Sequence, residues 1–472
     1  MPGPERPSPP TPLPQAGEGS LVERSLARVW HPCTQMQDHA GGADAHIPLI
    51  PIQSAEGVWL VGTDGRRYLD AVSSWWTNIF GHRHPHIVAS LKDQLDTLDH
   101  VIFAGFTHAP AVEVAERLCR LAPAGLDRCF FVDNGSAAVE AALKMSFHYW
   151  RNVGKPKKTR YIALTGGYHG ETLGALAVGH TGLYRDTYAP LLMNPIHVAS
   201  PDCYERAPGA SWEDHTRRMF ADMELALEQH AQEVCAVILE PLVQCAGGMR
   251  MYHPVYLSLL REACDRHGVH LIADEIAVGF GRTGRMFACE WAGISPDFMC
   301  LSKGLTGGTL PLACVLTTDP VYQAFYAEHR EGRAFLHSHS YTGNPLACRA
   351  ALATLEVFEQ QDWPARARLL GQYLWSAMAP LRSHRYVADI RQQGLILAVE
   401  LARSSRTREP FAATERRGLR AYRHALKSHK DFGVLLRPLG DVIYFMPPYV
   451  IEPREVQKMA QIAIEAIDIA TQ

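Results

Sequence analysis

The fold is decided by Leu271-Ile-Ala-Asp-Glu-Ile-Ala-Val-Gly-Phe-Gly-Arg-Thr-Gly, residues 271–284, followed by Pro296-Asp-Phe-Met-Cys-Leu-Ser-Lys-Gly-Leu, residues 296–305. Each stretch holds a short apolar run that ends at a chemically active side chain, Asp274 in the first and Lys303 in the second. Apolar runs without polar alternation are typical of strands buried on both faces. Ligands of such sheets bind beyond the carboxyl ends of the strands, so we expect Asp274 and Lys303 to reach the same edge.

Outward from these stretches, helical patterns alternate with similar apolar runs. This alternation predicts an α/β fold with a mainly parallel sheet covered by helices. Helices are predicted at 111–121, 136–150, 345–360 and 453–469. Strands are predicted at 129–132, 160–164, 234–239, 269–273, 298–301 and 312–317, with shorter pieces at 57–61, 67–72 and 394–400.

The chain is expected to divide into a tail and two interlocked lobes. Residues 1–20 hold seven prolines and no continuous apolar stretch, which predicts a disordered tail and excludes a signal peptide. Residues 99–343 form the predicted large domain. Residues 21–98 and 344–472 are predicted to build a smaller domain together.

Composition narrows the class of protein without identifying it. The 472 residues include 46 Lys and Arg against 49 Asp and Glu, which argues against a nucleic-acid or anionic-membrane partner. No apolar run approaches the roughly 18 residues of a membrane span. Eleven cysteines without a C-x-x-C pair indicate reduced thiols and a cytoplasmic enzyme.

Several features have simple structural explanations when taken alone. A lysine after a strand is usually a solvated loop residue, and an aspartate there is usually a helix cap. Residues 279–284 match the dinucleotide fingerprint G-x-G-x-x-G, but no helix is predicted to begin at these glycines. The histidines at 82, 84, 86, 337 and 339 have no cysteine or carboxylate set beside them, so no metal site is predicted.

Together, the aspartate and lysine motifs resemble the cofactor site of the class III aminotransferases. This resemblance implies the aspartate aminotransferase fold (type I of the pyridoxal 5′-phosphate enzymes), with a large domain and a smaller α+β domain. It also implies that Lys303 holds the cofactor's aldehyde and then moves the substrate proton. Asp274 would keep the pyridine nitrogen protonated, because the pyridinium is the stronger electron sink.

The same resemblance assigns the rest of the cofactor site. Gly135 and Ser136 open a helix whose free N–H groups suit a phosphate, although Asn-Gly-Ser alone is an ordinary helix cap. Tyr168 or His169 would cover one face of the cofactor ring, and Ile276 would press on the other. The segment Ser338-His339-Ser340 would reach across the interface of a homodimer, with Ser340 near the phosphate of the neighbouring subunit.

Within the class, longer segments resemble the enzymes that convert 8-amino-7-oxononanoate to 7,8-diaminononanoate in biotin synthesis, usually with S-adenosylmethionine as amino donor. The resemblance implies that Trp75, Trp76 and Tyr168 line an apolar wall beside Lys303, and that Arg437 binds the substrate carboxylate. Ser338 would also contact substrate. The matching segments are Trp30-His-Pro-Cys-Thr-Gln-Met, Ser73-Ser-Trp-Trp, His100-Val-Ile-Phe-Ala-Gly-Phe-Thr-His, Gly167-Tyr-His-Gly-Glu-Thr, His337-Ser-His-Ser-Tyr-Thr-Gly-Asn-Pro-Leu-Ala-Cys and Leu436-Arg-Pro-Leu-Gly-Asp-Val-Ile-Tyr-Phe-Met-Pro-Pro-Tyr.

Three residues depart from the pattern of this subgroup. Cys33 stands where a tyrosine is usual, Glu171 where an aspartate is more common, and Cys245 within a segment that usually reads Gln-Gly-Ala-Gly-Gly. Loss of a ring at Cys33 removes a surface on which the donor's adenine would stack, so lysine is an alternative donor. Another class III enzyme, such as an ω-amino acid aminotransferase, and a non-catalytic cofactor-binding protein are further alternatives. The role of Arg282 is left open.

Overall fold

The computed structural model describes residues 19–42 and 45–472. The predicted proline-rich tail, residues 1–20, lies outside the described residues except for its last two. In the described part of the chain, no helix is long and apolar enough to cross a membrane.

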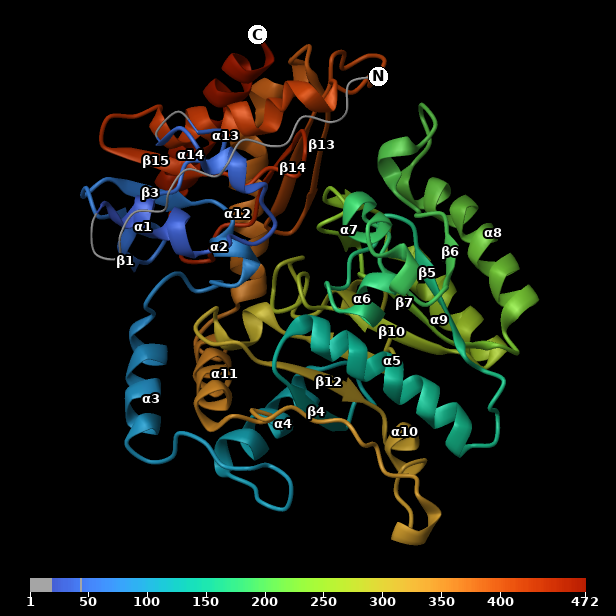
Figure 1. Ribbon diagram of the computed structural model, residues 1–472. Helices are drawn as coiled ribbons and strands as arrows, with labels where there is room; N and C mark the ends of the chain where they lie inside the picture. Colours follow the sequence, from blue (N-terminus) through green and yellow to red (C-terminus); the bar gives the residue numbers. More distant parts are fainter. Residues whose placement is uncertain (1–18, 43–44) are drawn as a thin grey trace, which may run out of the picture.

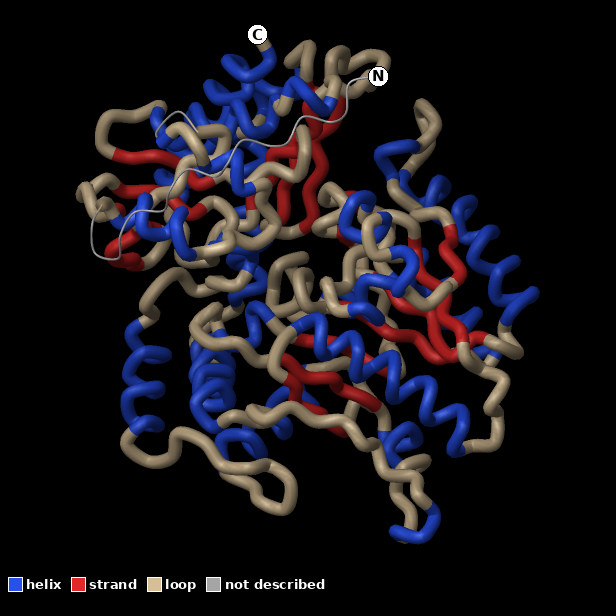
Figure 2. The backbone as a smooth tube through the Cα atoms, in the orientation of Figure 1, coloured by secondary structure: helices blue, strands red, loops and turns tan. Residues whose placement is uncertain are grey.

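A seven-stranded sheet forms the centre of the large lobe (Figures 1 and 2). All pairings are parallel except those of β12, which runs antiparallel to both of its neighbours, so the predicted mainly parallel sheet is confirmed. Six of the strands agree with the sequence prediction to within one residue at each end, and β6 was not predicted. The strand order is β4 (Arg128–Val132), β12 (Ala313–Thr317), β11 (Phe298–Leu301), β10 (His270–Asp274), β7 (Val234–Leu239), β5 (Arg160–Leu164) and β6 (Ile196–Val198).

Helices cover both faces of this sheet. On one face lies α5 (Gly135–Asn152), whose alanines at 137, 138, 141 and 142 are buried against the strands. Small side chains let this helix approach the sheet closely. The opposite face carries α4 (Ala109–Leu121), α8 (Trp212–His230), α9 (Val255–His267) and α11 (Pro345–Phe358).

A second lobe is built from the two ends of the chain, which lie together in Figure 1 as the blue and red segments. Its four-stranded sheet has the order β1 (Ile52–Glu56), β2 (Trp59–Gly62), β3 (Arg67–Asp70) and β15 (Phe432–Leu435). β3 and β15 are parallel neighbours. This pairing joins segments that are far apart in the sequence.

The other elements complete the two lobes. A three-stranded sheet contains β13 (Val387–Gln393), β14 (Ile396–Leu401) and β16 (Val442–Phe445), and a small hairpin pairs β8 (Val243–Gln244) with β9 (Arg250–Met251). The remaining α-helices are α1 (Leu21–Arg28), α2 (Ser73–Trp76), α3 (Pro85–Leu95), α6 (Leu173–Val178), α7 (Gly182–Asp186), α10 (Asp319–Gln323), α12 (Trp363–Ala377), α13 (Arg417–Lys427) and α14 (Pro453–Thr471).

Candidate active site

A cavity of about 410 Å³ lies beyond the carboxyl ends of β10 and β11, where Asp274 and Lys303 stand. It brings together side chains from the sheet edge, from α2 and from the start of α5. The sequence-predicted residues that line it are Trp75, Trp76, Gly135, Ser136, Tyr168, His169, Asp274, Ile276 and Lys303.

Asp274 is the last residue of β10 and is buried. Its Oδ2 lies 2.7 Å from His169 Nδ1, and its Oδ1 accepts a hydrogen bond of 3.1 Å from the Ile276 N–H. His169 is buried as well, and its Nε2 has no hydrogen-bond partner among the described residues. The carboxylate is therefore fixed in orientation by two donors.

Lys303 lies two residues beyond the end of β11 and adopts a left-handed backbone conformation, with φ of 44°. Burial lowers the pKa of its ammonium group, although Cys245, Asp274 and Glu240 act in the opposite direction. Its Nζ lies 4.5 Å from the centre of the Trp76 ring. A lowered pKa increases the fraction of neutral amine, which is the form that attacks an aldehyde or accepts a proton.

The N-terminus of α5 lines the cavity with Asn134, Gly135 and Ser136. Asn134 caps this helix by accepting from the Ala137 N–H at 3.0 Å, and in the described part of the chain nothing accepts from the N–H groups of Gly135 and Ser136. A Cβ on Gly135 would lie 3.1 Å from Ile276, so glycine keeps this corner open. Free N–H groups at a helix start bind phosphate.

Glu240, which follows β7, is a site residue that has no role among the sequence predictions. It is buried, and its two oxygens accept from the N–H groups of Tyr168 at 3.0 Å and Cys245 at 2.9 Å. Burial raises the pKa of this carboxyl group to about 7. Its place after a strand was visible in the sequence, whereas its burial and its bonds depend on the fold.

Cys33 and Glu171, two of the residues that depart from the subgroup pattern, are in contact at the mouth of the cavity. Glu171 Oε1 accepts from the Tyr168 hydroxyl at 3.0 Å and from the Cys33 thiol at 3.5 Å. Desolvation, followed by the nearby Glu171 carboxylate, raises the pKa of Cys33. The wall beside the cofactor cavity therefore carries a carboxylate and a neutral thiol.

The paired tryptophans lie on α2, whose backbone is a left-handed turn and not a regular α-helix. Ser73, Ser74, Trp75 and Trp76 all have positive φ angles, between 48° and 89°, and none of them is glycine. For ordinary residues this left-handed conformation costs about 1–2 kcal/mol each. The turn buries Trp76, whose indole N–H donates to the Tyr444 hydroxyl at 3.0 Å, and leaves Trp75 44% exposed.

Arg437 lies beyond Trp75 and extends the site. Its guanidinium carbon is 5.1 Å from the centre of the Trp75 ring. Trp75 lines the cofactor cavity and also an adjacent cavity of about 850 Å³, which Arg437 lines too. Lys303 thus lies in the first cavity and Arg437 in the second, and the ring of Trp75 borders both cavities.

Arg282, whose role the sequence left open, is fully buried behind the tryptophans. Its guanidinium donates to the carbonyls of Pro447 at 2.8 Å, Met446 at 3.2 Å and Trp76 at 3.4 Å. It therefore ties the end of the tryptophan turn to the segment after β16.

Three predicted site residues lie elsewhere. Ser338, His339 and Ser340 are not among the described residues that line the cofactor cavity of their own chain. Ser338 and Ser340 are exposed, and His339 Nδ1 lies 3.4 Å from Asp133 Oδ2.

The motifs that were set aside have ordinary structural roles. The glycine-rich residues 279–284 form turns after β10, and no described helix starts there. His82 pairs with Asp70, and His86 pairs with Glu356. The described residues hold no group of three or more metal-ligating side chains.

The residues present fit pyridoxal 5′-phosphate, the cofactor that the sequence motifs imply. A buried carboxylate suits a pyridinium nitrogen, a buried amine with a lowered pKa suits the aldehyde, and a helix start with free N–H groups suits the phosphate. The unpartnered Nε2 of His169 and the open corner at Gly135 lie on the lining of the same cavity.

Comparisons with known proteins agree with this geometry. The family model described as "Aminotransferase class-III" matches residues 41–467. A protein of Helicobacter pylori named adenosylmethionine-8-amino-7-oxononanoate aminotransferase is 42% identical, over 95% of this chain and 98% of its own. A protein of Geobacter sulfurreducens with the same name is 43% identical, over 94% of this chain and 96% of its own.

Solved structures are similar over the whole chain. The adenosylmethionine-8-amino-7-oxononanoate aminotransferase of Methanocaldococcus jannaschii has a TM-score of 0.89 and 35% identity, covering 96% of this chain and 99% of that one. An omega transaminase of Pseudomonas jessenii in complex with PMP has a TM-score of 0.90 and 29% identity, with the same coverage. The chain therefore belongs to the class III aminotransferases, the pyridoxal-phosphate-dependent family that its aspartate and lysine motifs predict.

Proposed function

We propose that this enzyme transfers an amino group to 8-amino-7-oxononanoate, giving 7,8-diaminononanoate for biotin synthesis, with S-adenosylmethionine as the amino donor. The observation that carries this proposal is the placement of Trp75, which separates Lys303 in one cavity from Arg437 in the next. An elongated acid fits this arrangement, with its reacting carbon near the lysine and its carboxylate at the arginine. The relatives from Helicobacter pylori and Geobacter sulfurreducens, which match over nearly their full length and are named adenosylmethionine-8-amino-7-oxononanoate aminotransferase, support this substrate and donor.

The chain's own residues account for the proton transfers. Bound pyridoxal phosphate supplies an electron sink for the substrate carbon. Lys303 Nζ is placed to take the proton from the donor's α-carbon and, in the second half of the cycle, to return a proton to the oxo acid's carbon. Asp274, held by His169 at 2.7 Å, stays oriented toward the cavity during both halves.

The remaining site residues bind the substrate and the cofactor phosphate and orient them. Arg437 presents a planar fork that matches the two oxygens of a carboxylate. Trp75, Trp76 and Tyr168 cover the apolar part of the chain between the carboxylate and the reacting carbon, and Ile276 packs beside the start of α5. Gly135 and Ser136 hold the phosphate through their N–H groups.

One assay tests the proposal. Purified enzyme with pyridoxal phosphate and 8-amino-7-oxononanoate is supplied in parallel with S-adenosylmethionine, with lysine and with an ω-amino acid. We expect diamine from the first mixture. If only the mixture with lysine gives diamine, the donor is lysine and not S-adenosylmethionine. If no mixture gives diamine, the substrate assignment is wrong.

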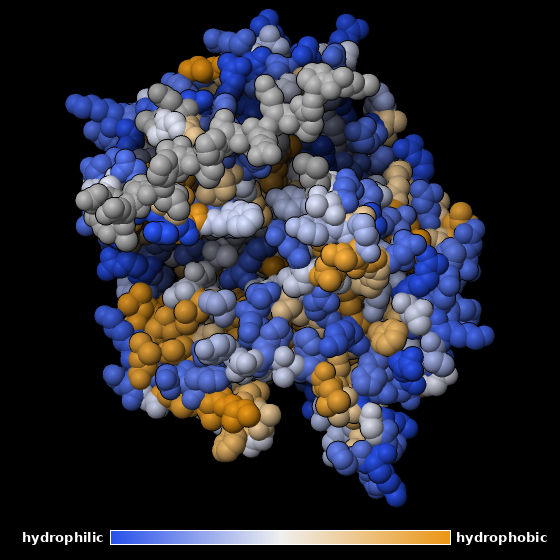
Figure 3. Space-filling view, in the orientation of Figure 1, coloured by the Kyte–Doolittle hydropathy of each residue, from blue (hydrophilic) through white to orange (hydrophobic). Residues whose placement is uncertain are grey.

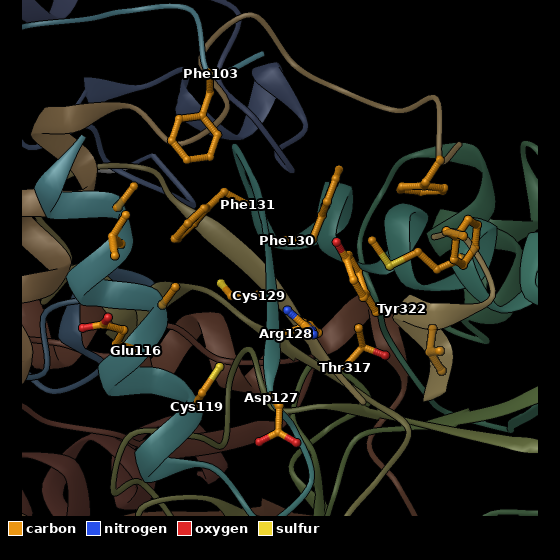
Figure 4. Close-up of a pocket in the computed structure, with 17 residues that line it drawn as sticks. Phe103, Glu116, Cys119, Asp127, Arg128, Cys129, Phe130, Phe131, Thr317 and Tyr322 are labelled. Atoms are coloured by element: carbon orange, nitrogen blue, oxygen red, sulfur yellow. The ribbon is translucent and has the colours of Figure 1, made fainter. Parts of the chain in front are cut away.

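We further propose a homodimer in which each subunit completes the other's site. Apolar side chains gather around the segment between α3 and α4 in the lower part of Figure 3, where Leu95, Ile102 and Phe106 are exposed. Beside it, a cavity of about 700 Å³ is lined by phenyl rings, among them Phe103, Phe130 and Phe131 (Figure 4). Such a large apolar surface is typical of subunit interfaces.

Hybrid dimers test the shared site directly. A Lys303→Ala subunit and a Ser340→Asp subunit are each expected to be inactive. Mixed dimers would contain one site with both intact Lys303 and intact Ser340, so mixing should restore up to about half of the wild-type activity per hybrid dimer. Absence of any restored activity in hybrids isolated with two different affinity tags would overturn the shared site.

We also propose the domain division at residues 21–98, 99–343 and 344–472, and a cytoplasmic location. The parallel pairing of β3 with β15 supports joining the first and last of these segments in one lobe. Within the last segment, α11 packs against the central sheet and links the two lobes. Free thiols at all eleven cysteines support a reducing compartment.

A further inference from the structure

The turn that carries Trp75 and Trp76 needs an anchor, because four successive residues without a glycine adopt positive φ angles. Residues other than glycine rarely adopt this backbone conformation unless the surrounding structure fixes it. Both tryptophans line the cofactor cavity, so whatever holds the turn also sets their positions.

The anchor begins at Asp70, the fully buried last residue of β3. Its Oδ1 accepts from the N–H groups of Val72 at 3.2 Å and Ser74 at 2.9 Å. Its Oδ2 accepts from the Ser74 hydroxyl at 2.7 Å and lies 2.9 Å from His82 Nε2. One carboxylate therefore ties the entrance of the turn at three points.

His82 holds that carboxylate in turn. Its backbone N–H donates to the Gly57 carbonyl at 2.7 Å, and its carbonyl accepts from the Gly57 N–H at 3.1 Å. The backbone of His82 is thus held to the loop between β1 and β2. Because a carboxylate only accepts, Nε2 of the ring is the donor. The first residue of the turn is also held, because Ser73 Oγ donates to the Met446 carbonyl at 2.7 Å.

We propose that Asp70 and His82 are a pair of positioning residues that hold the left-handed turn, and through it set both ends of the active site. At one end, Trp76 lies over the Lys303 amine at 4.5 Å. At the other end, Trp75 packs against Arg437 at 5.1 Å. The second half of this inference rests on the proposed role of Arg437 in binding the oxo acid.

Replacement of the carboxylate tests the pair. Asp70→Ala removes the carboxylate that accepts from Val72 and Ser74, and we expect kcat/KM for the oxo acid to fall at least tenfold, with a raised KM. The absorbance band of the cofactor bound at Lys303 should change its pH midpoint. Asp70→Asn keeps a carbonyl for the Val72 and Ser74 N–H groups and should retain most of the activity. His82→Ala should give an intermediate loss.

A second-site change separates positioning from general stability. Glycine adopts positive φ without a steric penalty, so Ser74→Gly should restore much of what Asp70→Ala loses, including folding if Asp70→Ala alone is unstable. His270→Gln is the matched control, since it removes a buried histidine hydrogen bond of 2.9 Å at the opposite end of β10. This control should lower the melting temperature without moving the KM or the cofactor band.

Two results would overturn the proposal. One is that Asp70→Ala and His82→Ala lower only the melting temperature, like His270→Gln. The other is that Ser74→Gly fails to improve Asp70→Ala. If the wild-type enzyme does not accept the oxo acid, the proposed substrate is wrong, but the cofactor band of the same variants still tests whether the pair positions Trp76 over Lys303.

Discussion

His169 Nδ1 lies 2.7 Å from Asp274 Oδ2, and both side chains are buried at the edge of the central sheet. A hydrogen bond to a charged group contributes about 1.5–3 kcal/mol. If His169 orients Asp274 for the cofactor, His169→Ala should lower kcat about 10- to 100-fold, and His169→Gln, which keeps an N–H donor, should lower it less. Steady-state kinetics at saturating cofactor measure this difference. Equal losses in the two variants would assign His169 to another task, such as covering the ring.

Lys303→Ala should remove all measurable turnover, because no other amine lines the cavity among the described residues. It should also abolish covalent attachment of the cofactor, which borohydride reduction followed by mass spectrometry detects. Lys303→Arg is the control for charge, since guanidinium is not a useful nucleophile near neutral pH. A Lys303→Ala protein that still carried reduced cofactor would place the attachment site on a different residue.

Arg437→Ala should raise the KM for the oxo acid about 10- to 100-fold, because a bidentate bond to the carboxylate is lost. The half-reaction with the amino donor alone should proceed at its normal rate in rapid-mixing absorbance measurements. Arg437→Lys should recover part of the affinity, since it restores the charge without the planar fork. An unchanged KM would exclude Arg437 as the carboxylate site.

Cys33→Tyr should favour S-adenosylmethionine as donor. The thiol lies 3.5 Å from Glu171 at the cavity mouth, and a ring there would provide a stacking surface worth about 0.5–1.5 kcal/mol. We expect the KM for S-adenosylmethionine to fall about two- to tenfold, while the KM for the oxo acid stays constant. Cys33→Ser is the control for loss of the thiol, and an equal effect of both variants would exclude stacking.

Stability should depend on His270 at mildly acidic pH. Burial lowers the pKa of this histidine to about 4, compared with 6.5 for a free histidine. Between these values the unfolded chain takes up a proton that the folded chain does not, so stability present above pH 6.5 is lost as the pH falls. At pH 5, His270 therefore lowers the free energy of unfolding by about 2 kcal/mol relative to neutral pH. In urea unfolding at pH 5 and 7.5, the loss of stability should be about 2 kcal/mol smaller in His270→Gln than in the wild type. Other buried histidines, such as His197, contribute to the loss in both proteins.

Three parts of the site that the sequence predicted share one property: each follows a strand that is mainly apolar. Asp274 after 269–273 and Lys303 after 298–301 were visible for this reason, as was the helix start at Gly135. The central sheet was predictable because a strand buried on both faces contains no polar alternation.

The parts that were missed depend on contacts between distant segments. The tryptophan turn carries no glycine, so nothing local predicts its left-handed backbone. His82 was one of several loop histidines until the fold placed it beside Asp70. Ser338, His339 and Ser340 lie outside the cofactor cavity of their own chain, and their proposed place is in the site of a neighbouring subunit.

The parallel pairing of β3 with β15 also orders events during synthesis of the chain. The sheet that carries Asp274 and Lys303 is complete once residue 317 has left the ribosome, whereas β3 waits for residues 432–435. Arg437 arrives two residues after β15 ends. A nascent chain therefore assembles the sheet edge with Asp274 and Lys303 first and adds Arg437, the proposed oxo-acid ligand, last. The edge of β3 is thus the surface that most needs protection from aggregation until translation ends.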